Sequence, residues 1–243
     1  MAGNHDFVAI DIGNTAIKFG VFINQEITEV HRVYHHDIQK LTAIASDYQH
    51  FKGALVSVSS EEFTDHIARL FPKVIPITRN GKWPFIMNYA TPETLGMDRI
   101  CNAAALTNQK TASYRVAIDI GTCVKFDALD PGLQYLGGSI SPGIDLRYQA
   151  LHAHTAKLPL LNKKDTIGLI GNSTVSSMQS GVINGMQAEI NGLIKRYEQD
   201  YKDLTFFVTG GDAQCFDFEG KNNIFVDENL TLKGIQQIYL CNA

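Results

Sequence analysis

A hexapeptide that occurs twice constrains the fold of this chain more than any other feature of its sequence. Residues 8–13 read Val-Ala-Ile-Asp-Ile-Gly, and residues 116–121 repeat the same six letters. Two copies separated by a little under half of the 243 residues are too few and too distant for a solenoid, whose repeats follow one another directly. The repeat therefore predicts two domains of similar plan, residues 1–112 and 113–243, with a boundary in the polar stretch near residues 110–113.

The sequence around each copy predicts the same order of elements. Apolar and β-branched runs predict strands at residues 7–12, 17–23, 26–33, 54–58 and 74–77 in the first half, and at 114–120, 123–129, 134–140 and 205–208 in the second. Helical spacing predicts a long helix at residues 175–201, which could break near Gly181 or Gly185, and a last helix at residues 228–240. Antiparallel strands followed by alternating helices and strands form an α/β unit, and two such units leave a cleft where ligands often bind.

The composition argues against several classes of function. The net charge is −4 and no long basic run is present, so we expect neither a nucleic-acid nor a membrane-surface partner. None of the four cysteines belongs to a C-x-x-C pair, which argues against zinc and favours a reducing, cytoplasmic location. We expect no signal peptide or membrane span, because Asp11 and Lys18 interrupt the apolar residues that start at Phe7.

The repeated turn has the chemistry of a phosphate-binding loop. Glycine lets the backbone approach a ligand closely, and successive turn N–H groups can bind an anion. Thr15 and Thr122 add hydroxyl donors, Lys18 adds a positive charge, and Asp11 can hold Mg²⁺ directly or through water. An ordinary hairpin turn also contains Asp, Gly and Asn. A hairpin alone does not require the same acid and hydroxyl twice, so we favour the phosphate site.

Five motifs follow one another along nearly the whole chain. They are D-I-G-N-T-A-I-K at 11–18, L-G-M-D-R at 95–99, D-I-G-T at 119–122, G-G-S-I-S-P-G at 137–143 and T-G-G-D-A at 209–213. Each motif alone is weak evidence. Together and in this order they resemble the type III pantothenate kinases, within the superfamily of actin, sugar kinases and acetate kinases. The resemblance implies an α/β fold of two duplicated ribonuclease-H-like (actin-like) domains with an interdomain cleft.

The resemblance also implies an activity and a set of site residues. The activity is ATP-dependent phosphorylation of the primary hydroxyl of pantothenate, the first step towards coenzyme A, by a homodimer that uses Mg²⁺ and K⁺ or NH₄⁺. Asp98 would be the general base, Asp11 would hold Mg²⁺ and Asp119 the monovalent cation. ATP would contact Asp11, Ile12, Gly13, Asn14, Thr15, Ala16, Ile17, Lys18 and Thr122. Pantothenate would contact Tyr89, Gly96, Met97, Asp98, Arg99 and Thr174.

One position departs from the family's pattern. Lys125 stands where the second phosphate motif usually has threonine. If Lys125 faces the nucleotide, ATP binding differs in detail from that of the family. If it points away along the strand, the change has no such effect. The sequence leaves both interpretations open.

Several of these residues also have purely structural interpretations. Asp98 could lie in the first turn of a helix that ends at Asn108, where the helix dipole stabilises a carboxylate. Arg99 could form a surface salt bridge. The glycines after the strand at 205–208 could form a strand-to-helix turn. The apolar face of residues 175–194, with Met178, Ile183 and Met186, fits either a core or a dimer surface.

Rival functions remain open at this stage. One is another small-molecule kinase or phosphatase of the same superfamily, and the other is an inactive nucleotide-binding regulator. The presence of Asp98 and Lys18 argues against the regulator. The histidine pairs 35–36 and 152/154 have no carboxylate or cysteine nearby at ligand spacing, so we interpret them as core or solvated residues rather than metal ligands.

Overall fold

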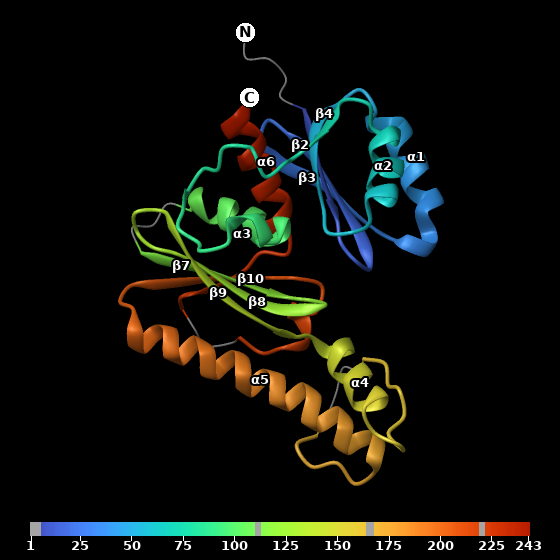
Figure 1. Ribbon diagram of the computed structural model, residues 1–243, viewed down its shortest axis with the longest axis vertical. Helices are drawn as coiled ribbons and strands as arrows, with labels where there is room; N and C mark the ends of the chain where they lie inside the picture. Colours follow the sequence, from blue (N-terminus) through green and yellow to red (C-terminus); the bar gives the residue numbers. More distant parts are fainter. Residues whose placement is uncertain (1–5, 110–112, 164–167, 219–221) are drawn as a thin grey trace. The chain divides into compact units, whose positions relative to one another are not determined.

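The computed structural model describes residues 6–109, 113–163, 168–218 and 222–243, and it divides into two compact units (Figure 1). The first unit comprises residues 1–110, 132–135 and 229–243, and the second comprises residues 111–131 and 136–228. This division differs from the predicted halves, because the C-terminal segment groups with the N-terminal part of the chain. Apart from Ser113, the predicted boundary lies outside the described residues.

A mixed five-stranded sheet forms the centre of the first unit. Its strands are β1 (Phe7–Ile12), β2 (Ala16–Ile23), β3 (Glu26–Tyr34), β4 (Lys52–Ser57) and β5 (Val74–Pro76). They lie in the order β3-β2-β1-β4-β5, with the first three antiparallel and β1, β4 and β5 parallel. The helices of this unit are α1 (Ile38–Tyr48), α2 (Glu61–Leu70), α3 (Met97–Thr107) and α6 (Leu230–Asn242), with short 3₁₀ helices at His35–Asp37 and Pro92–Thr94.

Alternate residues of β1 face opposite sides of this sheet. Ile10 and its neighbours of the same parity pack with Leu41 of α1 and Ile67 of α2. On the other face, the ring of Phe7 lies 4.7 Å from the ring of Tyr239 in α6. Figure 1 shows α1 and α2 on one side of the sheet and α6 on the other. Asp11 has the parity of Phe7, so its side chain leaves the strand on the α6 side.

Helices α3 and α6 pack against each other within the first unit, as Figure 1 shows. The hydroxyl of Thr231 donates to Oδ1 of the buried Asn102 at 2.9 Å. A Cβ atom built on Gly234 would lie 1.8 Å from the backbone oxygen of Cys101. Only glycine therefore permits the two backbones to approach this closely. The sequence predicted both the last helix and the helix that ends at Asn108, but not that the two pack on each other.

The second unit repeats the sheet order of the first. Its strands are β7 (Tyr114–Ile120), β8 (Cys123–Leu129), β9 (Gln134–Pro142), β10 (Leu204–Thr209) and β11 (Ile224–Val226). They lie in the order β9-β8-β7-β10-β11, which corresponds strand for strand to β3-β2-β1-β4-β5. The first two residues of β9 belong to the first unit, where they pair with β6 (Ile86–Met87).

Two helices cover one face of the second sheet. They are α4 (Ile144–Ala153) and α5 (Thr174–Asp200), and a 3₁₀ helix spans Ala213–Cys215. Ile118 and Ile120 of β7 pack with Tyr148 of α4 and Met186 of α5 in one core. Figure 1 shows α5 running along this side of the sheet.

The duplicated hexapeptide forms equivalent hairpins in the two units. Asp11 pairs with Lys18 across β1 and β2, and Asp119 pairs with Lys125 across β7 and β8. The turn of the second hairpin is one residue shorter, which accounts for the single gap between the two copies. The repeat in the sequence is therefore also a repeat of strand register.

Helix α5 corrects one expectation. It is continuous from residue 174 to 200, so the predicted break near Gly181 or Gly185 is wrong. Met178, Val182 and Met186 recur at intervals of four residues and are all buried, and this packing holds the helix together despite its glycines. The apolar stripe is thus part of the core of the second unit. Among the described residues, no helix is long and apolar enough to cross a membrane.

We predict that Gly234→Ala destabilises the protein, because the added methyl group would meet backbone atoms of Cys101 that have no room to move. The expected loss is about 2 kcal/mol or more of the free energy of unfolding, typical of overpacking. Gly192→Ala is the matched control, because nothing lies within 4 Å of its added Cβ. Alanine at that exposed helical position should be neutral or stabilising by up to about 1 kcal/mol. Urea unfolding monitored by circular dichroism measures both changes, and equal midpoints would contradict the prediction.

Candidate active site

The first hairpin loop presents polar groups at the end of β1. Asn14 and Thr15 are exposed at its tip, and Asp11 and Lys18 are partly exposed at its base. The N–H of Gly13 donates to the carbonyl of Ala16 at 3.1 Å and closes the turn. Ile12 and Ile17 were predicted to contact ATP, but their side chains are fully buried in the core. Only the backbone of these two residues is available to a ligand.

Asp98 lies in the first turn of α3. Its Oδ1 accepts a hydrogen bond from the backbone N–H of Arg99 at 2.9 Å, and the side chain is partly exposed. A carboxylate at this end of a helix is favoured by the helix dipole. Asp98 and Cys101 are three residues apart, so both project from the same side of α3.

The charges of Asp11 and Asp98 both act on the buried thiol of Cys101. Burial raises the pKa of the Cys101 thiol well above its ordinary value, and the negative charges of Asp11 and then Asp98 add to this shift. Both carboxylates are therefore near enough for their charges to act on the same thiol. Asp11 and Asp98, 87 positions apart in the sequence, thus both act on one residue of the first unit.

The remaining residues predicted to bind pantothenate lie in different parts of the chain. Gly96 is the N-cap of α3, and Met97 and Arg99 in its first turn are buried. Tyr89 is partly buried, with its ring 5.7 Å from that of Tyr135. Thr174 belongs to the second unit, where it is the exposed first residue of α5.

Arg79 was not predicted, but it holds the segment that leads into α3. Its Nη1 donates to the carbonyl of Leu95 at 2.5 Å and to that of Pro92 at 3.3 Å. These carbonyls lie just before Gly96, so Arg79 fixes the approach to the first turn of α3. No motif identifies Arg79, because its partners are backbone atoms.

Three of the predicted motifs meet at the second hairpin. The N–H of Gly143 donates to the carbonyl of Thr122 at 3.0 Å, and the N–H of Asp212 donates to the carbonyl of Ile120 at 2.9 Å. Gly210 has a φ of +101°, and a Cβ there would lie 2.2 Å from the oxygen of Ile120. The loops that follow β9 and β10 therefore pack directly on the turn that carries Thr122.

A cluster of charges surrounds the loop after β10. Lys163 Nζ lies 2.5 Å from Oδ1 of the largely buried Asp212 and 3.4 Å from Oδ2 of Asp145. Burial lowers the pKa of Lys163, but the hydrogen bond and charge of Asp212, together with Asp145, outweigh it, so the net shift is upward. The pair ties residue 163 to the T-G-G-D-A motif. No sequence motif identifies Lys163, since its partner Asp212 is 49 positions away.

The two expected cation sites differ in how well they fit an ion. Asp11 is partly exposed at the end of a strand beside a turn with exposed polar groups, which suits Mg²⁺ held by one carboxylate, water and phosphate. No group of three His, Cys, Asp or Glu side chains able to hold a metal occurs in the described part of the chain, and such a magnesium site needs none. At Asp119, in contrast, Lys125 Nζ lies 2.8 Å from Oδ2.

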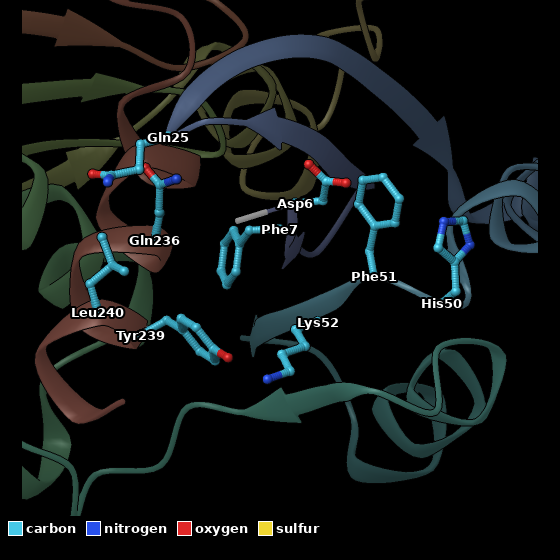
Figure 2. A pocket seen from close by; sticks show the side chains of 9 residues that line it. All are labelled: Asp6, Phe7, Gln25, His50, Phe51, Lys52, Gln236, Tyr239 and Leu240. Carbon is cyan, nitrogen blue, oxygen red and sulfur yellow. The ribbon is translucent and has the colours of Figure 1, made fainter. Parts of the chain in front are cut away.

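A pocket of about 280 Å³ lies in another part of the first unit (Figure 2). Figure 2 shows Phe7, Tyr239 and Lys52 around it, with Asp6 beside them. These residues belong to the amino ends of β1 and β4 and to α6. Asp11 is near the opposite end of β1. It is four residues from Phe7, or about 13 Å at the usual rise per residue of a strand. The pocket contains none of the predicted site residues.

Solved structures share this fold. A protein of Campylobacter jejuni assigned to the Baf family of transcriptional activators has a TM-score of 0.59 and 22% identity, with 96% of this chain and 97% of that one covered. An activator of 2-hydroxyisocaproyl-CoA dehydratase from Clostridium difficile with bound ADPNP has a TM-score of 0.54 and 14% identity, with 97% and 94% covered. With its two mixed sheets, the molecule is an actin-like α/β protein, which confirms the predicted fold class.

The sequence comparisons define the family. A family model described as type III pantothenate kinase matches residues 7–196. The type III pantothenate kinase of Phocaeicola vulgatus is 37% identical over 235 residues, covering 96% of this chain and 97% of the relative. That of Christiangramia forsetii is 38% identical over 240 residues, covering 95% and 96%. The chain belongs to the type III pantothenate kinases, enzymes that phosphorylate pantothenate in the biosynthesis of coenzyme A.

Proposed function

We propose that this kinase transfers the γ-phosphoryl group of Mg·ATP to the primary hydroxyl of pantothenate with Asp98 as general base, giving 4′-phosphopantothenate. The supporting observation is the packing of the first unit: Asp11 leaves β1 on the face that α6 covers, α6 packs on α3, and Asp98 lies in the first turn of α3. The charges of both acids also raise the pKa of the buried Cys101 thiol. A metal-binding acid and a proton acceptor must lie near each other if both are to act on one reacting phosphate.

The chemistry assigned to each group follows from the needs of phosphoryl transfer. Asp98 accepts the proton of the pantothenate hydroxyl, and the oxygen of that hydroxyl forms a bond to the γ-phosphorus. The bond between the γ-phosphorus and the oxygen of ADP breaks, and ADP leaves. The transition state is loose, so most of the catalysis comes from positioning and from neutralising charge. Mg²⁺ on Asp11 would neutralise charge on the phosphates. Lys18 would add a second positive charge, and the exposed tip of the loop would donate hydrogen bonds.

The second hairpin would contribute to ATP binding through Thr122. Its hydroxyl is exposed, and its backbone is held by Gly143. The loop at Gly210 would pass close to the adenosine, because glycine leaves room for a ligand beside the backbone. Tyr89, Gly96, Met97, Arg99 and Thr174 would bind pantothenate. The guanidinium of Arg99 suits the carboxylate of this substrate.

The rival functions receive less support. Another kinase or phosphatase of the same superfamily would share the fold and the hairpins, but the family match covers the segment that contains Tyr89, Asp98 and Arg99. An inactive regulator would not need Asp98 and Lys18 to be present together. Assays with pantothenate, simple sugars and acetate as phosphoryl acceptors distinguish these functions.

A second proposal concerns the environment of the enzyme. Cys101, Cys123, Cys215 and Cys241 are all free thiols, which suits a reducing, cytoplasmic location. We also propose a homodimer that uses the apolar groove between α4 and α5. This groove has a volume of about 730 Å³ and contains Leu151, Met178 and Val182 among its lining residues.

We predict that Asp98→Asn lowers kcat at least about 100-fold, the usual contribution of a general base. Asparagine keeps the Oδ1 that accepts the N–H of Arg99, so folding and ATP binding should change little. Steady-state kinetics measure kcat, and calorimetry measures the Kd for ATP. Asp65→Asn, at an exposed position of α2, is the matched control and should keep full activity. An Asp98→Asn enzyme with native kcat would remove Asp98 from the mechanism.

We predict that Asp11→Asn raises the Mg²⁺ concentration needed for half-maximal activity by at least about 10-fold, because a neutral amide binds this hard cation more weakly than a carboxylate. A titration of Mg²⁺ at fixed ATP measures the change. If the loss of activity were the same at every Mg²⁺ concentration, Asp11 would have a role other than holding the metal.

The proposed dimer predicts a solution mass of about twice 26.9 kDa by light scattering. Val182→Glu would put a charge into the groove, but this residue is also part of the core. Thr155→Glu, at an exposed residue of the same groove, is therefore the better variant and should shift the mass towards one chain. A native protein of single-chain mass at micromolar concentration would refute the dimer.

A further inference from the structure

Asp119 and Lys125 form an ion pair within the second unit. Their Oδ2 and Nζ atoms are 2.8 Å apart, and their side chains are only 13% and 15% exposed. The two residues are directly opposite each other on β7 and β8, where side chains share a face of the sheet. The lysine therefore points towards the acid, and not away along the strand as one of the two interpretations of the sequence had it.

The ion pair occupies the place expected for a monovalent cation. The family resemblance assigned K⁺ or NH₄⁺ to Asp119. The end of a lysine side chain is itself an alkylammonium ion with three N–H donors. A second cation on the same carboxylate would meet this fixed positive charge, and repulsion between like charges grows where water is excluded. The residues present at Asp119 do not fit a site for a separate monovalent ion.

The packing of β8 keeps the lysine in this place. Val124 and Phe126, on either side of Lys125, are buried in the core of the second unit. Because side chains alternate along a strand, Lys125 must then project from the opposite face, on which Asp119 lies. Moving its ammonium to the core face would require a shift of register that exposes the buried neighbours.

We propose that the ammonium group of Lys125 supplies, as part of the chain, the positive charge that relatives would take from K⁺ or NH₄⁺. Phosphorylation of pantothenate by this enzyme then needs no added monovalent cation. This inference rests on the proposed function and replaces the expectation of a K⁺-dependent kinase. The same group explains why threonine is dispensable at this position, because an ion site is no longer needed beside it.

The test compares the native enzyme with Lys125→Thr, which restores the residue usual in the family and removes the ammonium. Activity is measured without K⁺ and with about 0.1 M KCl, with tetramethylammonium chloride used to keep the ionic strength and its screening constant. The native enzyme should respond less than about 2-fold to K⁺, whereas Lys125→Thr should lose at least about 10-fold without K⁺ and recover when it is added.

Two further variants distinguish the effect of the lysine charge from that of its side-chain volume and provide a control. Lys125→Met removes the charge but keeps a long side chain beside Asp119, so its activity should fall and K⁺ should not restore it. Lys202→Thr, at an exposed position, is the control and should behave like the native enzyme. If Lys125→Thr does not fold, the native enzyme and Lys125→Met still decide the matter.

Direct binding of Tl⁺, a K⁺ analogue with a strong anomalous signal, gives a readout that does not depend on catalysis. Crystals of Lys125→Thr should show a Tl⁺ peak at Asp119, and native crystals should show none there. A native peak at Asp119, or a native activity stimulated more than about 10-fold by K⁺, would overturn the inference. No turnover of pantothenate in any salt would refute the proposed function instead, while the Tl⁺ result would still test the role of Lys125.

Discussion

The antiparallel register of one short hairpin determines where the charged groups of each unit lie. Residues directly opposite each other in such a pair share a face, so the register alone places an acid beside a lysine in both copies. Ile10 and Ile118, next to these acids in sequence, are buried on the other face. A slip by one residue would bury the charges and expose the isoleucines. The packing that stabilises each sheet thus also positions the acid of its hairpin.

Helix α3 connects the packing of the first unit with its proposed chemistry. One side of the helix carries Asp98, and its backbone at Cys101 touches Gly234 of α6. A substitution at Gly234 can therefore displace the proposed base, because α6 packs on α3. This coupling between α6 and Asp98 involves no chain of intermediate residues, since two helices in direct contact transmit a displacement from one to the other.

The sequence predicted most of the strands and the motifs, because alternating apolar residues and short glycine-containing turns are local signals. It could not predict that residues 229–243 complete the first unit, since the pattern of a helix reveals its apolar face but not its partner. Helix α4 escaped prediction because charged and polar residues such as Asp145 and Arg147 interrupt its apolar positions. The contacts of Lys163 and Lys125 were also beyond reach. They depend on which strands and loops become neighbours, and this is a property of the whole fold.

The position of α6 has a consequence for the order in which the protein forms during synthesis. The ribosome releases β1 to β5 early, but the helix that covers one face of their sheet is the last described element of the chain (Figure 1). Phe7 and Ala9 on that face are shielded from water only after Tyr239 and its neighbours in α6 have been synthesised. The part of the molecule that is made first is thus completed last, and until then one apolar face of its sheet stays exposed to water.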